Sequence, residues 1–200
     1  MGFYLELIRK VFQAVDENGK LRNRVVAFTA ATPREGVTYT VDLLARELAT
    51  QSHKRVLTVD AAAFQTLYLA DPNQVSRHCV ETEIENLLTL RSPELAPSAA
   101  GRERIGDWHA RPDYRTACLK ALRWNFDYVL IDCSSLAVSS EAATLAPIVD
   151  GISVVVKAAK TRRSQIQRCQ QIIESAGGNF LGFVLNQRQY PVPSWLYRRL

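Results

Sequence analysis

The sequence predicts a single α/β domain of three layers, in which a doubly wound and mostly parallel sheet lies between helices. Three observations lead to this prediction. Compact apolar runs without polar alternation recur along the chain, as is typical of strands buried on both faces of a parallel sheet. Segments with helical periodicity separate these runs, which is the order of crossover connections. No internal repeat or interdomain linker interrupts residues 1–200, so we expect one domain.

The first part of the chain carries the clearest strand, loop, helix and strand succession. Its apolar runs are short and rich in valine, and a polar stretch with a glycine precedes the first of them. The predicted elements are an amphipathic helix at 4–16, a strand at 24–30, a loop at 30–38, a helix at 38–50, and a second strand over KRVLTVDAAA that ends near Asp60.

The rest of the chain repeats the pattern after a less regular middle. The stretch rich in Pro, Ala, Gly and Arg is expected to be a surface loop, and Pro112 is expected in the first turn of the helix that follows. The predicted elements are a helix at 78–90, a loop at 91–111, a helix over PDYRTACLKALRWNF, a strand at 127–133, a helix at 139–148, a strand over GISVVVKA, a helix closed by Gly177 and Gly178, and a fifth strand over NFLGFVLNQ.

Composition excludes several functional classes. The net charge is +5, but the basic residues are scattered and form no stripe with interleaved aromatics, so we expect no nucleic-acid partner. The four cysteines contain no CxxC pair, which predicts free thiols and no zinc site. No apolar run approaches the ~20 residues that a bilayer requires, and the N-terminal stretch carries Glu6 and Arg9, so we expect a cytoplasmic protein without a transmembrane segment.

Three points on the chain are expected to meet at one edge of the sheet. The loop 30–38, Asp60 and Asp132 each follow a predicted strand, and ligands of open α/β sheets bind at the carboxyl ends of the strands. A loop that leads into a helix holds phosphates with its backbone N–H groups, and a strand-end Asp holds Mg²⁺ or positions the nucleophile. This is the arrangement of a P-loop nucleotide site. The alternative is that the two Asp residues merely end their strands.

Three segments give this arrangement a more specific resemblance. VVAFTAATPREGVTYT is similar to the Walker A segment of the bacterial tyrosine kinases, VLTVDAAAF to their second Walker segment, and FDYVLIDCSSL to their Walker B segment. VDGISVVVKAAKT and LGFVLNQ continue the match. The chain therefore resembles the cytoplasmic P-loop domain of the capsular exopolysaccharide tyrosine kinases (CpsD, CapB and Wzc-like), which implies a P-loop NTPase fold of the SIMIBI or MinD-like type.

The resemblance implies a nucleotide site that has lost central groups. Val37 stands where the family has the Walker lysine, which neutralises the β- and γ-phosphates, and Arg34 replaces a glycine. Ala62 replaces the second acid of the second Walker segment. The implied site residues are Pro33, Arg34, Glu35, Gly36, Val37, Thr38 and Asn186 for the nucleotide, Thr38, Asp60 and Asp132 for Mg²⁺, and Asp60 and Asp132 for a vestigial or weak catalytic role.

Two of these residues keep a second interpretation. Asn186 matches the family's asparagine that reads the adenine base, and it also suits the cap of a strand end. Arg34 either crowds a loop that must approach phosphate closely or supplies positive charge from another side. ATP and Mg²⁺ are therefore doubtful cofactors.

We accordingly expect a degenerate, pseudokinase-like protein. The resemblance implies that it regulates capsule or exopolysaccharide synthesis or export through a membrane chain-length-regulator (polysaccharide co-polymerase) partner, which would place it at the inner face of the bacterial membrane. Two alternatives stay open: an active ATP-dependent tyrosine autokinase that uses Arg34, and a positioning ATPase of the MinD/ParA type, which would carry a further lysine where this chain has Thr32.

The first helix and the last residues bear on assembly and phosphorylation. Glu6 and Arg9 match the first two positions of the family's ring-forming Glu-x-x-Arg-x-x-Arg motif, which implies a homo-oligomer interface, while Phe12 takes the third position. The two residues could equally form a pair three positions apart within one solvated helix. Tyr190 and Tyr197 do not form the terminal tyrosine cluster that family kinases phosphorylate.

Overall fold

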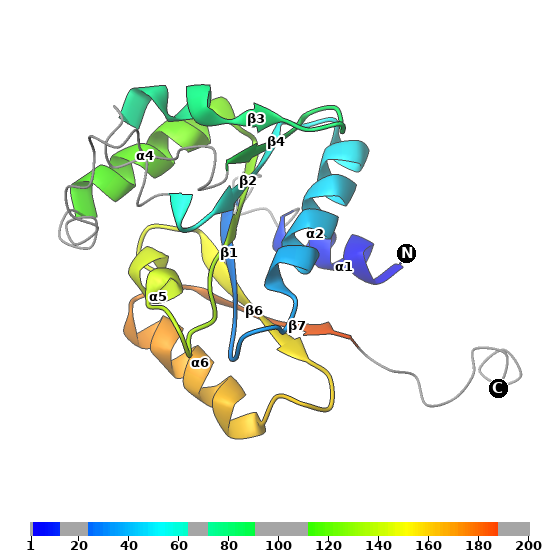
Figure 1. Cartoon of the computed structure of the whole chain (residues 1–200), viewed down its shortest axis with the longest axis vertical. Coiled ribbons are helices and arrows are strands. Elements are labelled where there is room, and N and C mark those ends of the chain that lie inside the picture. The colour runs from blue at the N-terminus through cyan, green and yellow to red at the C-terminus, as the bar shows by residue number, and fades with distance from the viewer. Residues whose placement is uncertain (1, 13–23, 64–71, 91–111, 188–200) are drawn as a thin grey trace, which may run out of the picture.

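The structure is a computed structural model that describes residues 2–12, 24–63, 72–90 and 112–187. Its centre is a seven-stranded sheet in the order β3-β4-β2-β5-β1-β6-β7 (Figure 1). Every neighbouring pair is parallel except β3 and β4. The strands span Val25–Ala30 (β1), Val56–Asp60 (β2), Val80–Glu81 (β3), Leu87–Leu90 (β4), Tyr128–Asp132 (β5), Gly151–Lys157 (β6) and Phe180–Asn186 (β7).

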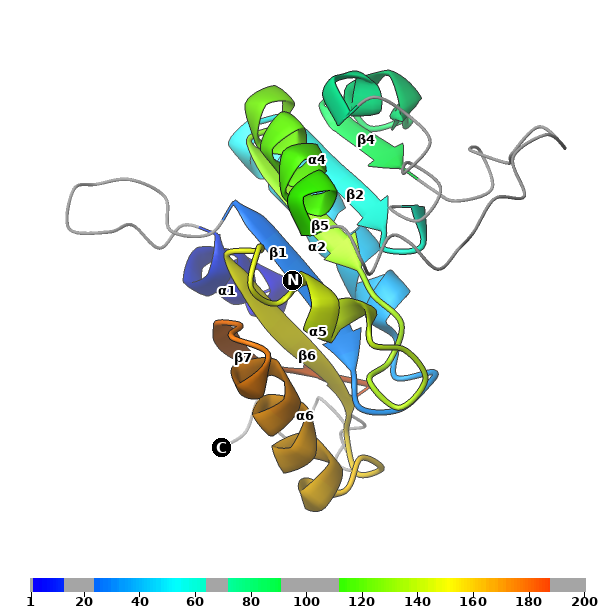
Figure 2. The same cartoon turned by 90° about the vertical axis from the view of Figure 1, so that its left-hand side faces the viewer.

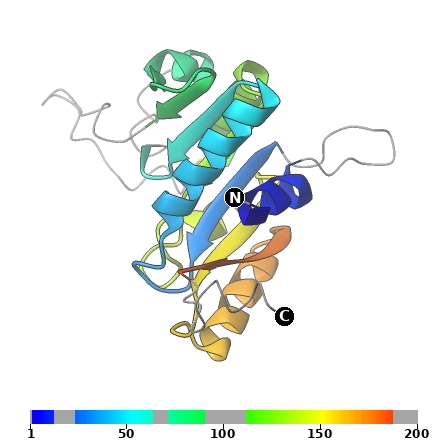
Figure 3. The same cartoon turned by 90° about the vertical axis from the view of Figure 1, so that its right-hand side faces the viewer.

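Helices cover both faces of the sheet. Figure 2 shows one helical layer in front of the strands, and Figure 3 shows the other layer from the opposite side. The layer in Figure 2 contains α4 (Pro112–Asn125), α5 (Glu141–Leu145) and α6 (Arg163–Ser175), the layer in Figure 3 contains α1 (Gly2–Val11) and α2 (Val37–Ser52), and a 3₁₀ helix, η1, spans Pro72–His78.

An apolar core lies on each face of the sheet, between the strands and one layer of helices. One core joins the sheet to α4, α5 and α6, with Leu122, Leu145 and Ile173 among its buried side chains. The other joins it to α1 and α2 through side chains such as Phe12 and Leu44. The predicted three-layer, doubly wound architecture is therefore confirmed. Burial on both faces explains why β1, β2, β5 and β6 are continuous apolar runs in the sequence.

The prediction of a helix at 78–90 is wrong. Residues 80–90 form the antiparallel pair β3 and β4, and β4 adds to the sheet beside β2. Asn86 adopts a left-handed backbone conformation with φ 65°, which an α-helix does not accommodate, and the hydroxyl of Thr82 donates to the carbonyl of Leu87 at 2.8 Å. The short apolar run Leu87–Leu90 fits a strand or a helix by periodicity, and pairing with β2 decides between them.

The other predicted helices and strands are confirmed with shifted ends, as far as the structure describes them. The first helix ends at Val11, and positions 13–16 of its predicted span lie outside the described residues. Helix α5 is shorter than the predicted 139–148. The loop predicted at 91–111 also lies outside the described residues. Within the described ranges, no helix is long and apolar enough to cross a membrane.

A polar network ties the sheet together at the amino-terminal ends of the strands. The carboxylate of Asp150 accepts hydrogen bonds from the backbone N–H groups of Arg24 (2.8 Å) and Val25 (2.7 Å). The guanidinium of Arg123 grips the same carboxylate with two bonds of 2.8 Å. The Arg24 guanidinium in turn donates to the carbonyls of Phe126 (2.8 Å) and Asp127 (3.0 Å). The starts of β1 and β6 are thus joined to the end of α4.

Candidate nucleotide-type pocket

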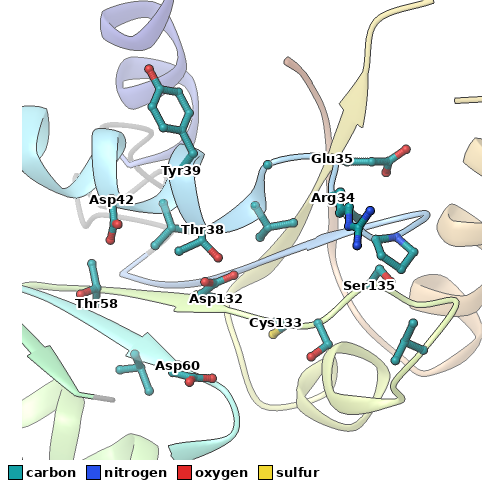
Figure 4. Close-up of a pocket in the computed structure, with 18 of the residues that line it drawn as sticks. Arg34, Glu35, Thr38, Tyr39, Asp42, Thr58, Asp60, Asp132, Cys133 and Ser135 are labelled. Carbon is teal, nitrogen blue, oxygen red and sulfur yellow. The ribbon is translucent and has the colours of Figure 1, made fainter. Parts of the chain in front are cut away.

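The predicted site residues meet in one pocket at the carboxyl edge of the sheet (Figure 4). The pocket has a volume of about 710 Å³. Asp60 and Asp132 are register partners on the neighbouring strands β2 and β5, so the topology places them side by side. The predicted lining residues are Pro33, Arg34, Glu35, Gly36, Val37, Thr38, Asp60 and Asp132. The convergence predicted for the loop 30–38, Asp60 and Asp132 is therefore present.

Two residues of the loop between β1 and α2 adopt left-handed backbone conformations before the helix begins. Arg34 has φ 68° and Gly36 has φ 89°, and α2 starts at Val37. Glycine adopts such angles without penalty, whereas a residue with a Cβ pays about 1–2 kcal/mol. The side chain of Arg34 is exposed. The loop thus bends sharply before α2, although Arg34 replaces the glycine of the resembled motif.

Glu35 points into the protein and is bound by neighbouring loops. Only 3% of the residue is exposed, and Figure 4 shows its carboxylate directed away from Asp60 and Asp132. The carboxylate accepts hydrogen bonds from the N–H groups of Ala31 (2.9 Å) and Thr32 (3.2 Å). The hydroxyls of Thr32 and Thr161 also donate to it. Glu35 therefore supports the loop from behind.

Asn186 lies behind the loop and is not among the residues that line the pocket. Its side-chain N–H₂ donates to the carbonyl of Glu35 at 2.9 Å, and its side-chain oxygen accepts the N–H of Gln187 at 2.8 Å. The residue is 8% exposed. In this arrangement Asn186 braces the loop, and its expected contact with an adenine base stays a prediction.

Replacing Gly36 by Ala tests this close packing. A Cβ at Gly36 would lie 2.2 Å from the side-chain nitrogen of Asn186, so the bond from Asn186 to Glu35 must break. Gly177→Ala is the matched control, since Gly177 has a similar φ of 79° with nothing within 4 Å of its Cβ. We expect Gly36→Ala to lower the free energy of unfolding by about 1–2 kcal/mol more than Gly177→Ala does. Equal losses in urea denaturation would contradict this packing.

Val37 provides no positive charge for a phosphate bound at the loop. Its side chain is partly buried and packs against the apolar core shared by α1 and α2. Among the described lining residues, the basic side chain is Arg34 and the acidic ones that remain beside it are Asp42, Asp60 and Asp132, since the carboxylate of Glu35 is directed away from Asp60 and Asp132. The pocket that the structure describes is therefore predominantly acidic.

The candidate Mg²⁺ ligands share the pocket. Thr38 lies exposed in the first turn of α2, and the carboxylate of Asp60 accepts the N–H of Ala62 at 3.0 Å. The described residues contain no group of three or more His, Cys, Asp or Glu that could hold a metal ion. Mg²⁺ is commonly held by one or two carboxylates together with substrate phosphates. Thr38, Asp60 and Asp132 fit such a site when a phosphate completes it.

The loop after β5 is organised by Glu141. Its buried carboxylate accepts the N–H of Ser134 at 3.1 Å, and its own N–H donates to the hydroxyl of Ser139 at 3.2 Å. Cys133 is fully enclosed: burial, followed by the nearby charges of Glu141 and Asp132, raises the pKa of its thiol well above the ordinary value. Cys133 therefore stays protonated and is a spacer in this loop. All four cysteines are free thiols, as predicted.

Asp42 is a lining residue that the motif analysis missed. It lies one helical turn after Thr38 in α2, so its spacing of four residues could have identified it. Thr58 on β2 and Thr89 on the neighbouring strand β4 also line the pocket. Neither residue belongs to a recognisable sequence motif. They reach the pocket because β2 and β4 are neighbours in the sheet.

The predicted oligomer residues lie on α1, away from the pocket lining. Glu6 forms an exposed ion pair with Lys10 at 2.9 Å, one turn along the same helix. Arg9 belongs to α1, but its side chain lies outside the described part of the chain. The ring interface at Glu6 and Arg9 stays a prediction. Tyr190 and Tyr197 lie outside the described residues.

The chain has the α/β fold that is found in P-loop NTPases. The kinase domain of the Escherichia coli tyrosine kinase ETK superposes with a TM-score of 0.67 and 22% identity, covering 86% of this chain and 72% of that one. MinD from Pyrococcus horikoshii, in its complex with Mg-ADP, superposes with a TM-score of 0.59 and 16% identity, covering 88% of this chain and 76% of that one. The predicted fold class is therefore confirmed.

Comparison of the sequence with known proteins finds similar bacterial tyrosine kinases. The tyrosine-protein kinase CpsD of Streptococcus pneumoniae is 24% identical over 212 residues, covering 96% of this chain and 90% of that protein. CpsD of Streptococcus agalactiae is 24% identical over 180 residues, covering 82% and 76%. No family model matches the chain. The chain is similar to the CpsD-type bacterial tyrosine kinases over most of its length, which confirms the resemblance predicted from its motifs.

Proposed function

We propose that this chain is a non-catalytic relative of the bacterial tyrosine kinases that regulates capsule or exopolysaccharide assembly. The observation that carries the proposal is Val37, an apolar residue packed against the core at the position of the phosphate-neutralising lysine. The surrounding frame is intact: the curved loop, Thr38, Asp60 and Asp132 line the same pocket. The protein keeps the shape of a nucleotide site without its principal cation.

Electrostatics argue against tight nucleotide binding. The transferred phosphate of a kinase is held by a lysine and metal ions that neutralise its negative charge. Removing one preorganised hydrogen-bond donor from an oxyanion hole costs about 2.7–4 kcal/mol of transition-state stabilisation, and a phosphate site without its lysine loses a preorganised charge in the same way. Here Arg34 is the one basic residue among the described lining residues, against the carboxylates of Asp42, Asp60 and Asp132. A triphosphate would therefore meet like charge in most directions.

Thr38, Asp60 and Asp132 would hold Mg²⁺ if a nucleotide entered. Bound Mg²⁺ would supply charge neutralisation at the phosphate oxygens. The chain itself supplies the backbone N–H groups at the start of α2, where the helix dipole favours an anion. These groups orient a phosphate, but none of them replaces the ammonium that Val37 lacks.

The partner we propose is a membrane protein of the chain-length-regulator type. This part of the proposal rests on the motif resemblance and on the CpsD relatives. Through that partner the chain would act at the inner face of the membrane. Formation of a homo-oligomer through Glu6 and Arg9 belongs to the same proposal.

A turnover assay tests the absence of kinase chemistry. We expect the full chain, incubated with Mg-ATP labelled in the γ-phosphate, to form no phosphotyrosine and to release no phosphate above a protein-free blank. The assay is run with and without the membrane fraction, because a partner could complete the site. Phosphotyrosine on the chain that disappears in the double variant Asp60→Asn with Asp132→Asn would refute the proposal.

Arg34 supports a second candidate, an active kinase with a rearranged site. Its guanidinium is exposed and lines the pocket, so it is the described group that could neutralise phosphate. Under this candidate, the assay above detects activity that Arg34→Ala abolishes and Arg34→Lys partly retains. The two candidates therefore give opposite results with the wild-type chain.

A further inference from the structure

Glu35 is the meeting point of three segments that are far apart in the sequence. Its carboxylate binds the N–H groups of Ala31 and Thr32 in its own loop and the hydroxyl of Thr161 between β6 and α6. Its backbone carbonyl accepts a hydrogen bond from Asn186 at the end of β7. A single buried residue thus connects the first loop of the domain to the last two strands.

Thr161 has one hydroxyl proton and two candidate acceptors. Its oxygen accepts the N–H of Lys157 at 3.0 Å, while the carboxylate of Glu35 and the carbonyl of Lys157, at 3.2 Å, compete for its proton. The contact with Glu35 is the shorter of the two, and shorter contacts make the stronger hydrogen bonds. The proton therefore goes to Glu35, and the hydroxyl links the Lys157 N–H to the carboxylate in one chain of bonds.

The ends of β6 and β7, which hold Glu35 through Thr161 and Asn186, are also bonded to each other. The N–H of Ala158 donates to the carbonyl of Asn186 at 2.9 Å, and Lys157 and Asn186 are register partners on β6 and β7. Gly36 packs so closely on Asn186 that no Cβ fits between them. The loop that follows β6 and the end of β7 therefore move together, and both hold Glu35.

We infer that Glu35 and Thr161 form a clamp that makes the phosphate-type loop (residues 30–36) and the β6–α6 loop (residues 158–162) one conformational unit. The clamp joins a loop that lines the pocket to a loop outside the pocket lining. This inference deepens the proposed function, on which it rests: the regulatory shape of the site is controlled from the β6–α6 loop. A contact on that loop would therefore change the pocket.

Amide hydrogen exchange measured by NMR tests the clamp, because a substitution in one loop can be followed by exchange at amides of the other loop. Glu35→Gln weakens the acceptor of the Ala31 and Thr32 N–H groups directly, and Thr161→Val removes the acceptor of the Lys157 N–H. The clamp predicts that each variant also acts on the other loop. We expect Glu35→Gln to speed exchange at Lys157, and Thr161→Val to speed exchange at Ala31 and Thr32, each by about tenfold.

Two controls keep this experiment decisive. Thr161→Ser retains the hydroxyl and is expected to keep wild-type exchange at Ala31 and Thr32. The N–H groups of Arg24 and Val25, bonded to Asp150 at the opposite edge of the sheet, are expected to be unchanged in every variant that folds. If Glu35→Gln does not fold, Thr161→Val and Thr161→Ser decide the question by themselves.

The inference is overturned if each variant changes exchange only at the amides whose acceptor it removes, because the two loops would then be independent. Its failure is distinct from failure of the proposed function. Mg-ATP added to the wild-type chain is expected to leave exchange at Ala31 and Thr32 unchanged. Strong protection by Mg-ATP would overturn the proposed function, whereas the crossed effects of the variants report on the coupling alone.

Discussion

Val37→Lys is expected to bind Mg-ATP about 10- to 100-fold more tightly than the wild-type chain, because a hydrogen bond between charged groups contributes about 1.5–3 kcal/mol. The frame that would receive the new ammonium is present, because the loop, Thr38, Asp60 and Asp132 line one pocket. Lysine can lay its aliphatic stem along the apolar surface that Val37 now covers and extend its charge into the pocket. Isothermal titration calorimetry measures the change directly.

Val37→Met is the matched control for this experiment. Methionine has an unbranched side chain of similar reach without charge, so it separates the effect of the ammonium from the effect of removing the branched side chain. We expect Val37→Met to bind Mg-ATP no better than wild type. Equal gains in the two variants would show that Val37 blocks the pocket by its shape, and no gain in Val37→Lys would show that the frame itself has degenerated.

Asp150→Ala is expected to lower the free energy of unfolding by about 2–4 kcal/mol, because it removes four hydrogen bonds and leaves a guanidinium and two N–H groups without their acceptor. The side chains of Asp150 and Arg123 are 18% and 31% exposed, so solvent compensates part of the loss. Urea denaturation at pH 7 measures the effect. Asp113→Asn, which removes an exposed carboxylate in the first turn of α4, is expected to change stability far less.

The same carboxylate predicts a pH dependence. Burial acts to raise the pKa of Asp150, but the hydrogen bonds from Arg123, Val25 and Arg24 outweigh burial and hold it below its ordinary value. The folded pKa is thus lower than the unfolded value of about 3.9. The stabilisation is present above the unfolded value and is lost as the pH falls through the folded value. The stability difference between wild type and Asp150→Asn should be constant from pH 7 to about 5 and shrink below about 4.

The sequence was sufficient for the sheet wherever burial is complete. The runs that became β1, β2, β5 and β6 are apolar on both faces, which leaves a parallel strand as the simplest interpretation. The strand-end positions of Asp60 and Asp132 then placed the site, because parallel strands bring their carboxyl ends to one edge. This part of the prediction needed only local patterns and one topological rule.

The sequence was insufficient where distant contacts decide. Leu87–Leu90 is a strand because β2 offers it a free edge, and no local pattern reports that edge. Glu35 belongs to a motif that suggests a pocket residue, yet its carboxylate turns inward to Thr161, 126 positions along the chain. Asn186 similarly braces the loop across 151 positions. These roles depend on the order of the strands, which composition and spacing do not specify.

Titration of the wild-type chain with Mg-ATP tests the central claim most directly. The claim is that an apolar side chain at position 37 leaves an otherwise well-formed loop unable to hold a triphosphate. Calorimetry at near-physiological salt, with Val37→Lys as the positive reference, is predicted to show heat of dilution alone for wild type. A saturable wild-type isotherm as tight as that of Val37→Lys, abolished by Asp132→Asn, would contradict the claim.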